Sequence, residues 1–241
     1  MNDYAPATLP RITITNGDKT VVFHSMMHVS SPEFYQEISN DMTSLQSHDF
    51  VFFYEWVKKG TDESVEKLGQ LIGTDVSPEM YDTIAKIANL TFQGDEIYEN
   101  ILPSTNVDMS TDDIVEFAKQ ESIEAPVQKE VDAIKFINER YPTLTPFQKN
   151  IAQVMARGGM NVLLRKYTDP EVTESLKKMI PVFGVILDKR NTLVVDTINA
   201  SSNRNIYIHY GAMHFAGILE WLQKNDPRWH EIDRVNFVAI R

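Results

Sequence analysis

The sequence predicts an α/β fold, in which a mixed central β-sheet is flanked by helices and interrupted by a mainly helical middle insertion. Three observations predict it. A hairpin pattern opens the chain, apolar residues recur at helical spacing through its middle, and a strand, a helix and a strand follow one another at its end. We expect a single domain over residues 1–241, with the insertion at about residues 62–187.

A β-hairpin and a helix begin the predicted fold. Residues 11–15 and 20–24 are rich in β-forming residues and flank an Asn-Gly-Asp turn at residues 16–18, a combination that closes hairpins. A helix should begin at Pro32, with Ser31 as its N-cap. A serine side chain accepts hydrogen bonds from the free N–H groups of a first helical turn, where proline is tolerated because it needs no such bond.

The spacing of apolar residues predicts the later elements. The run at residues 49–54 is short, apolar and aromatic, which indicates a buried strand, and it ends at Glu55. Helical periodicity predicts helices at residues 65–72, 78–88, 111–119, 131–139, 146–156 and 170–187, with two short strands at 89–93 and 106–109. The chain then closes with a strand at 205–210, a helix at 215–223 and a strand at 234–240.

Composition narrows the possible chemistry and partners. Of 241 residues, 42% are hydrophobic and 24% charged, as in an ordinary globular protein. The net charge of −11 and the lack of a basic stripe exclude nucleic acid as an expected partner, which leaves a peptide or a small molecule. Because the chain has no cysteine, its candidate catalytic and metal-binding groups are imidazole, carboxylate and hydroxyl groups. We expect a soluble chain with no signal peptide and no transmembrane segment, while its compartment and oligomeric state stay open.

Two short segments of the chain resemble each other around a histidine. Aligning His214 in IHYGAMHFAG with His28 in FHSMMHVSS places Gly211 over Ser25. We call residues 25–28 the first histidine segment and residues 211–214 the second. Because each follows a predicted strand and precedes a predicted helix, the alignment predicts two imidazoles in equivalent poses on two strands.

Polar residues just past the ends of three strands are the candidate site. Ligands of open α/β sheets bind beyond the carboxyl ends of the strands, where His28, Glu55 and His214 are expected to meet. Imidazole and carboxylate groups are ordinary ligands of a divalent transition metal, which assists hydrolysis. Without a metal, Glu55 can serve as general base and a histidine as acid. The residue types alone leave both versions open.

Structural explanations compete with this interpretation. A histidine near a strand end is more often a hydrogen-bonded structural residue than a ligand, and His24 and His209 lie inside predicted strands. Glu55 can be paired with a lysine such as Lys58. Arg190 follows a long apolar helix, where an arginine is usually a solvated helix-end charge.

Several motifs together resemble the TraB/GumN/Tiki family, within a wider group that includes erythromycin esterase and ChaN proteins. That family has two GxxH motifs, a glutamate after an early strand and an arginine before the second motif. Residues 211–214 match the second motif completely, whereas the first histidine segment has Ser25 in place of glycine. Glu55 follows VFFY as the family glutamate does, and Arg190-Asn191 resembles the family Arg-Asn pair. Gln93 in TFQ and Asp108 in NVDMS resemble further polar positions of the group.

The resemblance implies a metal-dependent hydrolase, in the Tiki branch a protease that uses manganese or cobalt, although zinc or iron would suit the same ligand types. It implies that His28, Glu55 and His214 hold the metal or activate its water, that Arg190 stabilises a carboxylate or a developing oxyanion, and that the polar residues Gln93, Asp108 and Asn191 contact substrate. Two alternatives remain: a non-catalytic protein that binds peptides, of the pheromone-shutdown type, and a ChaN-like protein that binds haem or iron.

Overall fold

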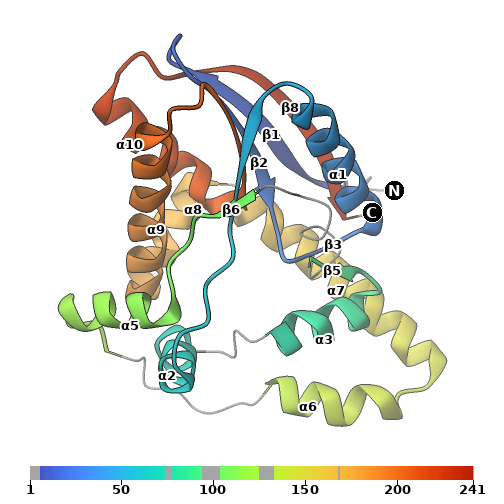
Figure 1. Cartoon of the computed structure of the whole chain (residues 1–241). Helices are drawn as coiled ribbons and strands as arrows, with labels where there is room; N and C mark the ends of the chain where they lie inside the picture. Colours follow the sequence, from blue (N-terminus) through green and yellow to red (C-terminus); the bar gives the residue numbers. More distant parts are fainter. Residues whose placement is uncertain (1–5, 74–77, 94–103, 125–132, 168, 241) are drawn as a thin grey trace.

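A six-stranded mixed sheet forms the centre of the molecule (Figure 1). The computed structural model describes residues 6–73, 78–93, 104–124, 133–167 and 169–240. The strand order is β6-β4-β7-β2-β1-β8, in which neighbours from β6 to β2 are parallel and β1 runs antiparallel to both β2 and β8. The strands are β1 (Ala7–Thr15), β2 (Thr20–Met26), β4 (Phe50–Tyr54), β6 (Ser104–Asn106), β7 (Asn205–Gly211) and β8 (His230–Ile240). The predicted mixed α/β sheet is confirmed.

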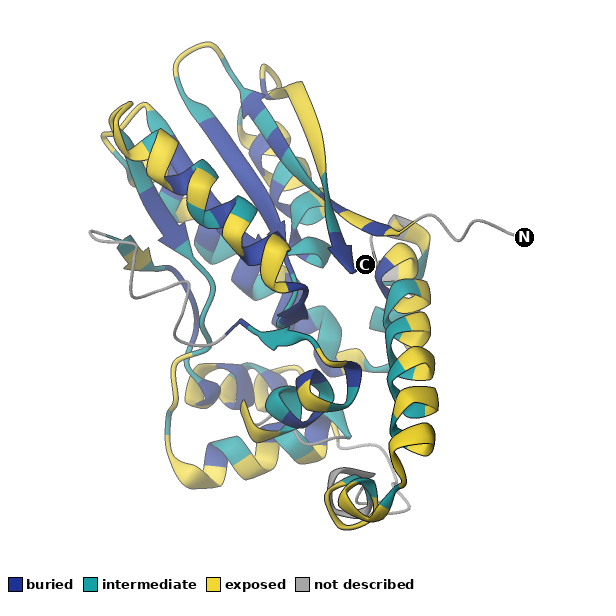
Figure 2. Cartoon of the chain, turned by 90° about the vertical axis from the view of Figure 1, so that its right-hand side faces the viewer, coloured by how far each residue is buried: buried dark blue, intermediate teal, exposed yellow. Residues whose placement is uncertain are grey.

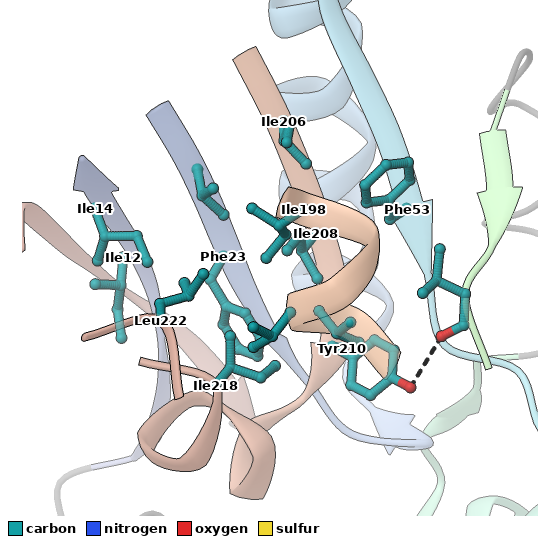
Figure 3. Close-up of a cluster of buried hydrophobic side chains, with 14 of the residues drawn as sticks. Ile12, Ile14, Phe23, Phe53, Ile198, Ile206, Ile208, Tyr210, Ile218 and Leu222 are labelled. Carbon is teal, nitrogen blue, oxygen red and sulfur yellow. Dashed lines mark hydrogen bonds between the residues drawn. The ribbon is translucent and has the colours of Figure 1, made fainter. Parts of the chain in front are cut away.

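Helices cover both faces of this sheet and enclose two apolar cores. On one face, α1 (Pro32–Gln46) and the end of α7 (Pro146–Tyr167) pack on the sheet. On the other, α9 (Pro181–Ala200) and α10 (Phe215–Asn225) cover a cluster of isoleucine, valine and aromatic side chains (Figure 3). Side chains of one strand alternate between the two cores, because successive residues of a strand point to opposite faces.

The remaining elements lie mostly below the carboxyl ends of the parallel strands in Figure 1. A two-stranded sheet joins β3 (Val29–Ser30) to β5 (Thr91–Phe92). Among the described residues the other helices are α2 (Asp62–Ile72), α3 (Pro78–Ala88), α5 (Thr111–Gln120), α6 (Ala133–Arg140), α8 (Pro170–Met179) and the short 3-10 turns η1 (Tyr141–Thr143) and η2 (Ala212–His214). No helix in the described ranges is long and apolar enough to cross a bilayer.

Most predicted elements are present, and two predictions were wrong. The hairpin forms, and the Ser31 hydroxyl caps α1 by accepting from the Phe34 N–H at 3.4 Å. The helix predicted at residues 170–187 is two helices, because Pro181 begins α9 and gives no N–H to a continuous helix. The strand predicted at residues 106–109 lies earlier, at Ser104–Asn106, and it joins the main sheet. The range 62–187 therefore contributes a sheet strand as well as helices.

Candidate functional site

A buried cluster of charges joins three elements at the carboxyl ends of the parallel strands. Glu55 directly follows β4, and its backbone N–H extends the pairing with β7 by donating to the His209 carbonyl at 3.0 Å. Its carboxylate accepts a hydrogen bond through Oε1 from Nη2 of Arg190 and another through Oε2 from the backbone N–H of Gly211. Arg190 also binds Asp108, with Nε 2.7 Å from Oδ1 and Nη2 2.7 Å from Oδ2. One guanidinium thus holds two carboxylates.

The charges in this cluster set one another's protonation. Burial on its own would raise the pKa of Glu55, but the charge of Arg190, the nearby histidines and the Gly211 N–H hold that pKa at about 2. Burial raises the pKa of Asp108 despite its contact with Arg190, and the neighbouring charge of Glu55 acts in the same direction. The pKa of Arg190 is raised well above its usual value by the two carboxylates, against the effect of burial. Glu55 is therefore the firmly ionised carboxylate of the pair.

His214 is held beside Glu55 by a buried asparagine. Its Nδ1 lies 2.7 Å from Oδ1 of Asn191 on α9, and its Nε2 lies 3.8 Å from Oε1 of Glu55. Because an amide oxygen only accepts, Nδ1 carries the proton and Nε2 keeps its lone pair. Burial lowers the pKa of His214 to about 3, so the imidazole is neutral. The ring of Tyr210 meets it edge-on at 4.8 Å between centroids.

His28 has a similar arrangement with a different partner. Its Nδ1 lies 3.2 Å from Oε1 of Gln93, and its backbone carbonyl accepts from the Gln93 N–H at 2.7 Å. The β3–β5 ladder places Gln93 there, one residue beyond β5. The ring of Tyr81 on α3 packs against the imidazole at 4.4 Å. Burial lowers the pKa of His28, and the charges of Glu55 and Arg190 also act on it, so the second neutral imidazole belongs to the same electrostatic site.

The two histidine segments are not equivalent in the structure, and this part of the prediction was wrong. In the β2–β7 register Met26 pairs with Gly211 and Ser25 pairs with Tyr210, one residue away from the sequence alignment. After β2 the chain stays extended and forms β3, so His28 precedes a strand. After β7 it turns into η2, so His214 opens α10. A one-residue offset places aligned side chains on opposite faces of a sheet.

All seven predicted site residues lie at this end of the sheet, in two groups. Glu55, Arg190, Asp108, His214 and Asn191 are linked by direct contacts, whereas His28 and Gln93 form a pair within electrostatic range of them. Among the described residues, no three His, Asp or Glu side chains are arranged to hold one metal ion. Both oxygens of the Glu55 carboxylate accept hydrogen bonds, one from Arg190 and the other from the Gly211 N–H.

The structural explanations for single residues have mixed outcomes. Glu55 is paired with Arg190, and not with Lys58. Arg190 is inside α9 and 5% exposed, so its interpretation as a solvated helix-end charge was wrong. His24 and His209 are buried in the two central strands, where His24 Nδ1 lies 2.9 Å from the Tyr207 hydroxyl.

Three residues that sequence reasoning missed also shape the site. A Cβ on Gly217 of α10 would clash with the Asn191 side chain, so this glycine lets the amide reach His214. Tyr210 stacks under the Arg190 guanidinium at 5.4 Å and donates its hydroxyl to the Val107 carbonyl at 3.0 Å (Figure 3). Tyr81 packs on His28. The small residues that surround the second histidine segment, in GAMHFAG, were the available signal for Gly217.

A groove of about 400 Å³ lies behind both histidine segments, between α10 and the β1–β8 edge of the sheet. Ser25, Ala212 and Met213 line it, together with side chains of α10 and β8 such as Phe215 and Arg234. The seven candidate residues do not line this groove, so the charged site and the groove are separate features that share the backbone of both histidine segments. Comparisons with protein-family models, with curated proteins and with solved structures find no match for this chain.

Proposed function

We propose that the protein is a metal-dependent hydrolase of peptide or amide bonds, as the resemblance to the TraB/GumN/Tiki family implies. One observation carries the proposal. Two neutral imidazoles, each with Nδ1 fixed by a side-chain amide oxygen, are gathered with an ionised carboxylate and a buried arginine at the strand ends. An amide oxygen that holds the Nδ1 proton leaves Nε2 as a lone-pair donor, which is the form in which a histidine binds a metal.

The imidazole and carboxylate groups of the site are donor types that a divalent transition metal accepts, although in the described arrangement no three of them surround one position. His28 and His214 would hold the ion through Nε2, because their Nδ1 atoms are committed to Gln93 and Asn191. Glu55 would be the carboxylate ligand or the group that activates water. Such an ion polarises the carbonyl of the substrate and lowers the pKa of water. Manganese or cobalt is favoured by the resemblance, and imidazole and carboxylate ligands also accept zinc or iron.

Catalysis by these side chains without a metal has weaker support. A general base works best with a pKa near the operating pH, whereas the pKa of Glu55 is held at about 2. A general acid must carry a proton, yet burial lowers the pKa of His214 to about 3, so its Nε2 has none to give at neutral pH. Both values suit a site whose histidines donate lone pairs to a cation.

Arg190 has the geometry to fix the carboxylate and to stabilise negative charge in the substrate. Its Nε and Nη2 bind Asp108 and Glu55, and the Tyr210 hydroxyl also interacts with the guanidinium. In this proposal the same guanidinium charge stabilises the oxyanion that would form when the scissile carbonyl is attacked. Gln93 and Asn191 act through the histidines that they orient, and Asp108 acts through Arg190. Their predicted contact with substrate is therefore replaced in this proposal by a positioning role.

Metal uptake is the first test. Metal content by mass spectrometry and affinity by calorimetry should be measured with manganese, cobalt and zinc on the parent and on His28→Ala and His214→Ala variants, with exposed His48→Ala as the matched control. We expect stoichiometric uptake by the parent and the control, and its loss in both site variants. Glu55→Gln should abolish uptake or peptide cleavage. No uptake by the parent, or uptake unchanged in both histidine variants, would contradict the proposal.

A non-catalytic protein that binds peptides is the second candidate. The observation that favours it is the saturated Glu55 carboxylate, whose two oxygens accept from Arg190 and from Gly211. On this alternative the parent binds peptides without cutting them, and a chelator leaves binding unchanged. Chelator-sensitive cleavage, followed by mass spectrometry of the products, separates the two functions.

A further inference from the structure

The outward face of α7 is apolar over four helical turns. Its exposed large side chains are Phe147, Ile151, Val154, Met155, Val162 and Leu163, with exposed fractions between 46% and 72%. Exposed positions continue along the whole length of this helix in Figure 2. Contiguous apolar patches of this kind are rare on monomeric proteins and mark interaction surfaces.

The described contacts that anchor α7 to the fold come from one side of the helix. There Leu164 is buried against the sheet, and Oδ1 of Asn161 accepts from the Ala7 N–H at 3.0 Å. Arg157 caps the end of α3 by donating from Nε to the Ala88 carbonyl at 2.7 Å. Because these contacts anchor the helix, the outward apolar side chains contribute little to the stability of one copy.

The outward positions have a two-fold pattern. If two α7 helices pack antiparallel about an axis between Val154 and Met155, Phe147 lies level with Val162 of the second copy. In the same arrangement Ile151 lies level with Gly158. An added Cβ at Gly158 would meet nothing within 4 Å, so there is open space for the isoleucine of a second copy. A closed two-fold interface needs this self-complementarity.

The distribution of charge on α7 favours a second copy of the chain over a lipid surface as the partner of its outward face. A helix that binds anionic membranes needs Lys and Arg side chains free beside its apolar face. In α7, Arg157 donates to the Ala88 carbonyl at the end of α3, the Lys149 ammonium lies over the Tyr141 ring, and the other two basic residues, Arg165 and Lys166, lie together in the last turn. The residues of the two-fold pattern are themselves uncharged: Phe147, Ile151, Val154, Met155, Gly158 and Val162.

We propose that the protein forms a two-fold symmetric dimer through antiparallel packing of α7 against α7 of a second copy, with Val154 and Met155 at the axis. This inference is independent of the proposed hydrolase site. Sedimentation should find the parent at twice the 27.6 kDa chain mass. The double change Val154→Glu with Met155→Glu should give a folded monomer, and Ile232→Glu, at a comparably exposed apolar position on β8, should stay dimeric. A monomeric parent, or a dimer unaffected by the double change, would overturn the proposal.

Single cysteines test the register, because the chain has none of its own. Across the proposed axis the two copies of residue 154 differ by about 1.5 Å along the helix, whereas the two copies of residue 147 differ by about 22 Å. Val154→Cys should therefore form a disulfide-linked dimer on mild oxidation, and Phe147→Cys should not. Efficient cross-linking at residue 147 would show parallel packing and overturn the antiparallel dimer.

Gly158→Leu distinguishes the dimer from lipid binding. A leucine enlarges the apolar face but fills the space for Ile151, so it should weaken the dimer roughly tenfold or more. Vesicles of phosphatidylserine, mixed with parent and variant, provide the other readout. Tighter binding of the leucine variant to vesicles, with no change in self-association, would assign α7 to a membrane surface and overturn the proposal.

Discussion

The two histidine segments resemble each other in sequence and differ in structure. In the second segment the chain leaves β7 through Gly211 and turns at once into η2 and α10. In the first it leaves β2 through Met26 and stays extended into β3. Both nevertheless end with a neutral imidazole whose Nδ1 meets an amide oxygen. The tautomer of each histidine is thus fixed by its amide partner, although the two segments place their histidines with different backbone conformations.

The comparison also explains the serine at position 25. A Cβ on Gly211 would lie 3.0 Å from Oε2 of Glu55, so a side chain there would crowd the carboxylate. Ser25 pairs with Tyr210 and not with Gly211, and its side chain lines the groove on the opposite face. The requirement for glycine therefore applies to one histidine segment, because Glu55 approaches only that one.

The largest effect should come from the arginine that holds both carboxylates of the site. Arg190→Met leaves the buried Asp108 and the Glu55 carboxylate without their cation, and removing one partner of a buried ion cluster costs about 3–5 kcal/mol. Urea unfolding followed by circular dichroism measures this free energy. Arg11→Met, which breaks the more exposed pair with Asp41, is the comparison and should cost less. Equal losses of unfolding free energy in the two variants would show that burial does not make the Arg190 cluster more costly to break than the Arg11–Asp41 pair.

Removing the side-chain amide of Asn191 or of Gln93 tests whether His214 and His28 depend equally on these partners for metal binding and stability. Asn191→Ala and Gln93→Ala should each lower metal affinity about 10- to 100-fold, the usual effect of losing a residue that orients a ligand histidine. The loss in stability should be larger for Asn191, because His214 is only 3% exposed whereas His28 is half-buried. Calorimetry and thermal unfolding give the two readouts. Unchanged metal affinity in both variants would refute the positioning role.

Substitutions of Gly211 and Ser25, which the sequence alignment pairs, test the same difference between the two histidine segments. Gly211→Ser should destabilise the fold by about 1–3 kcal/mol and reduce metal uptake, because its Cβ displaces the Glu55 carboxylate. Ser25→Gly should change stability less and leave metal uptake intact, since no site carboxylate faces it. Denaturant unfolding and metal analysis of both variants decide this. A larger loss of stability from Ser25→Gly than from Gly211→Ser would contradict our explanation.

A pH-dependent effect is expected from the histidines that do match across the two strands, His24 and His209. Burial lowers the pKa of His209 to about 3 from 6.5, so between these values the unfolded chain binds more protons than the folded one. Stability should be complete above about pH 6.5 and fall toward pH 3, by at most about 1.4 kcal/mol per pH unit for this group.

His209→Gln should flatten that pH profile more than His24→Gln. Burial lowers the pKa of His24 too, but the hydrogen bond and charge of Asp41 partly restore it. Unfolding midpoints from pH 7 to pH 4.5 measure the slopes, with the exposed His48→Gln as control. An unchanged slope in His209→Gln would show that another group causes the acid sensitivity.

Local patterns predicted the strands and most helices, because hairpin turns, caps and apolar spacing act over a few residues. The placement of His28, Glu55 and His214 at one end of the sheet also followed, from the rule that strand ends share one edge. Arg190, Asn191, Gln93 and Asp108 were expected there only because of the family resemblance. The register between β2 and β7 could not be predicted, because a one-residue offset between these strands does not change the similarity of the two histidine segments. The burial of Arg190 was missed because its two carboxylates come from residues 82 and 135 positions away. Whether the chain binds metal and cuts peptides stays a prediction.

The position of β7 in the sheet has a consequence for biosynthesis. This strand lies between β2 and β4 and is hydrogen-bonded to both, although it is translated some 150 residues after β4. Until it leaves the ribosome, the nascent chain holds two unpaired strand edges, and Glu55 lacks the Gly211 N–H. Sheets closed by such distant segments form slowly and expose edges that aggregate. We therefore expect the sheet and the site to assemble together, after most of the chain has been made.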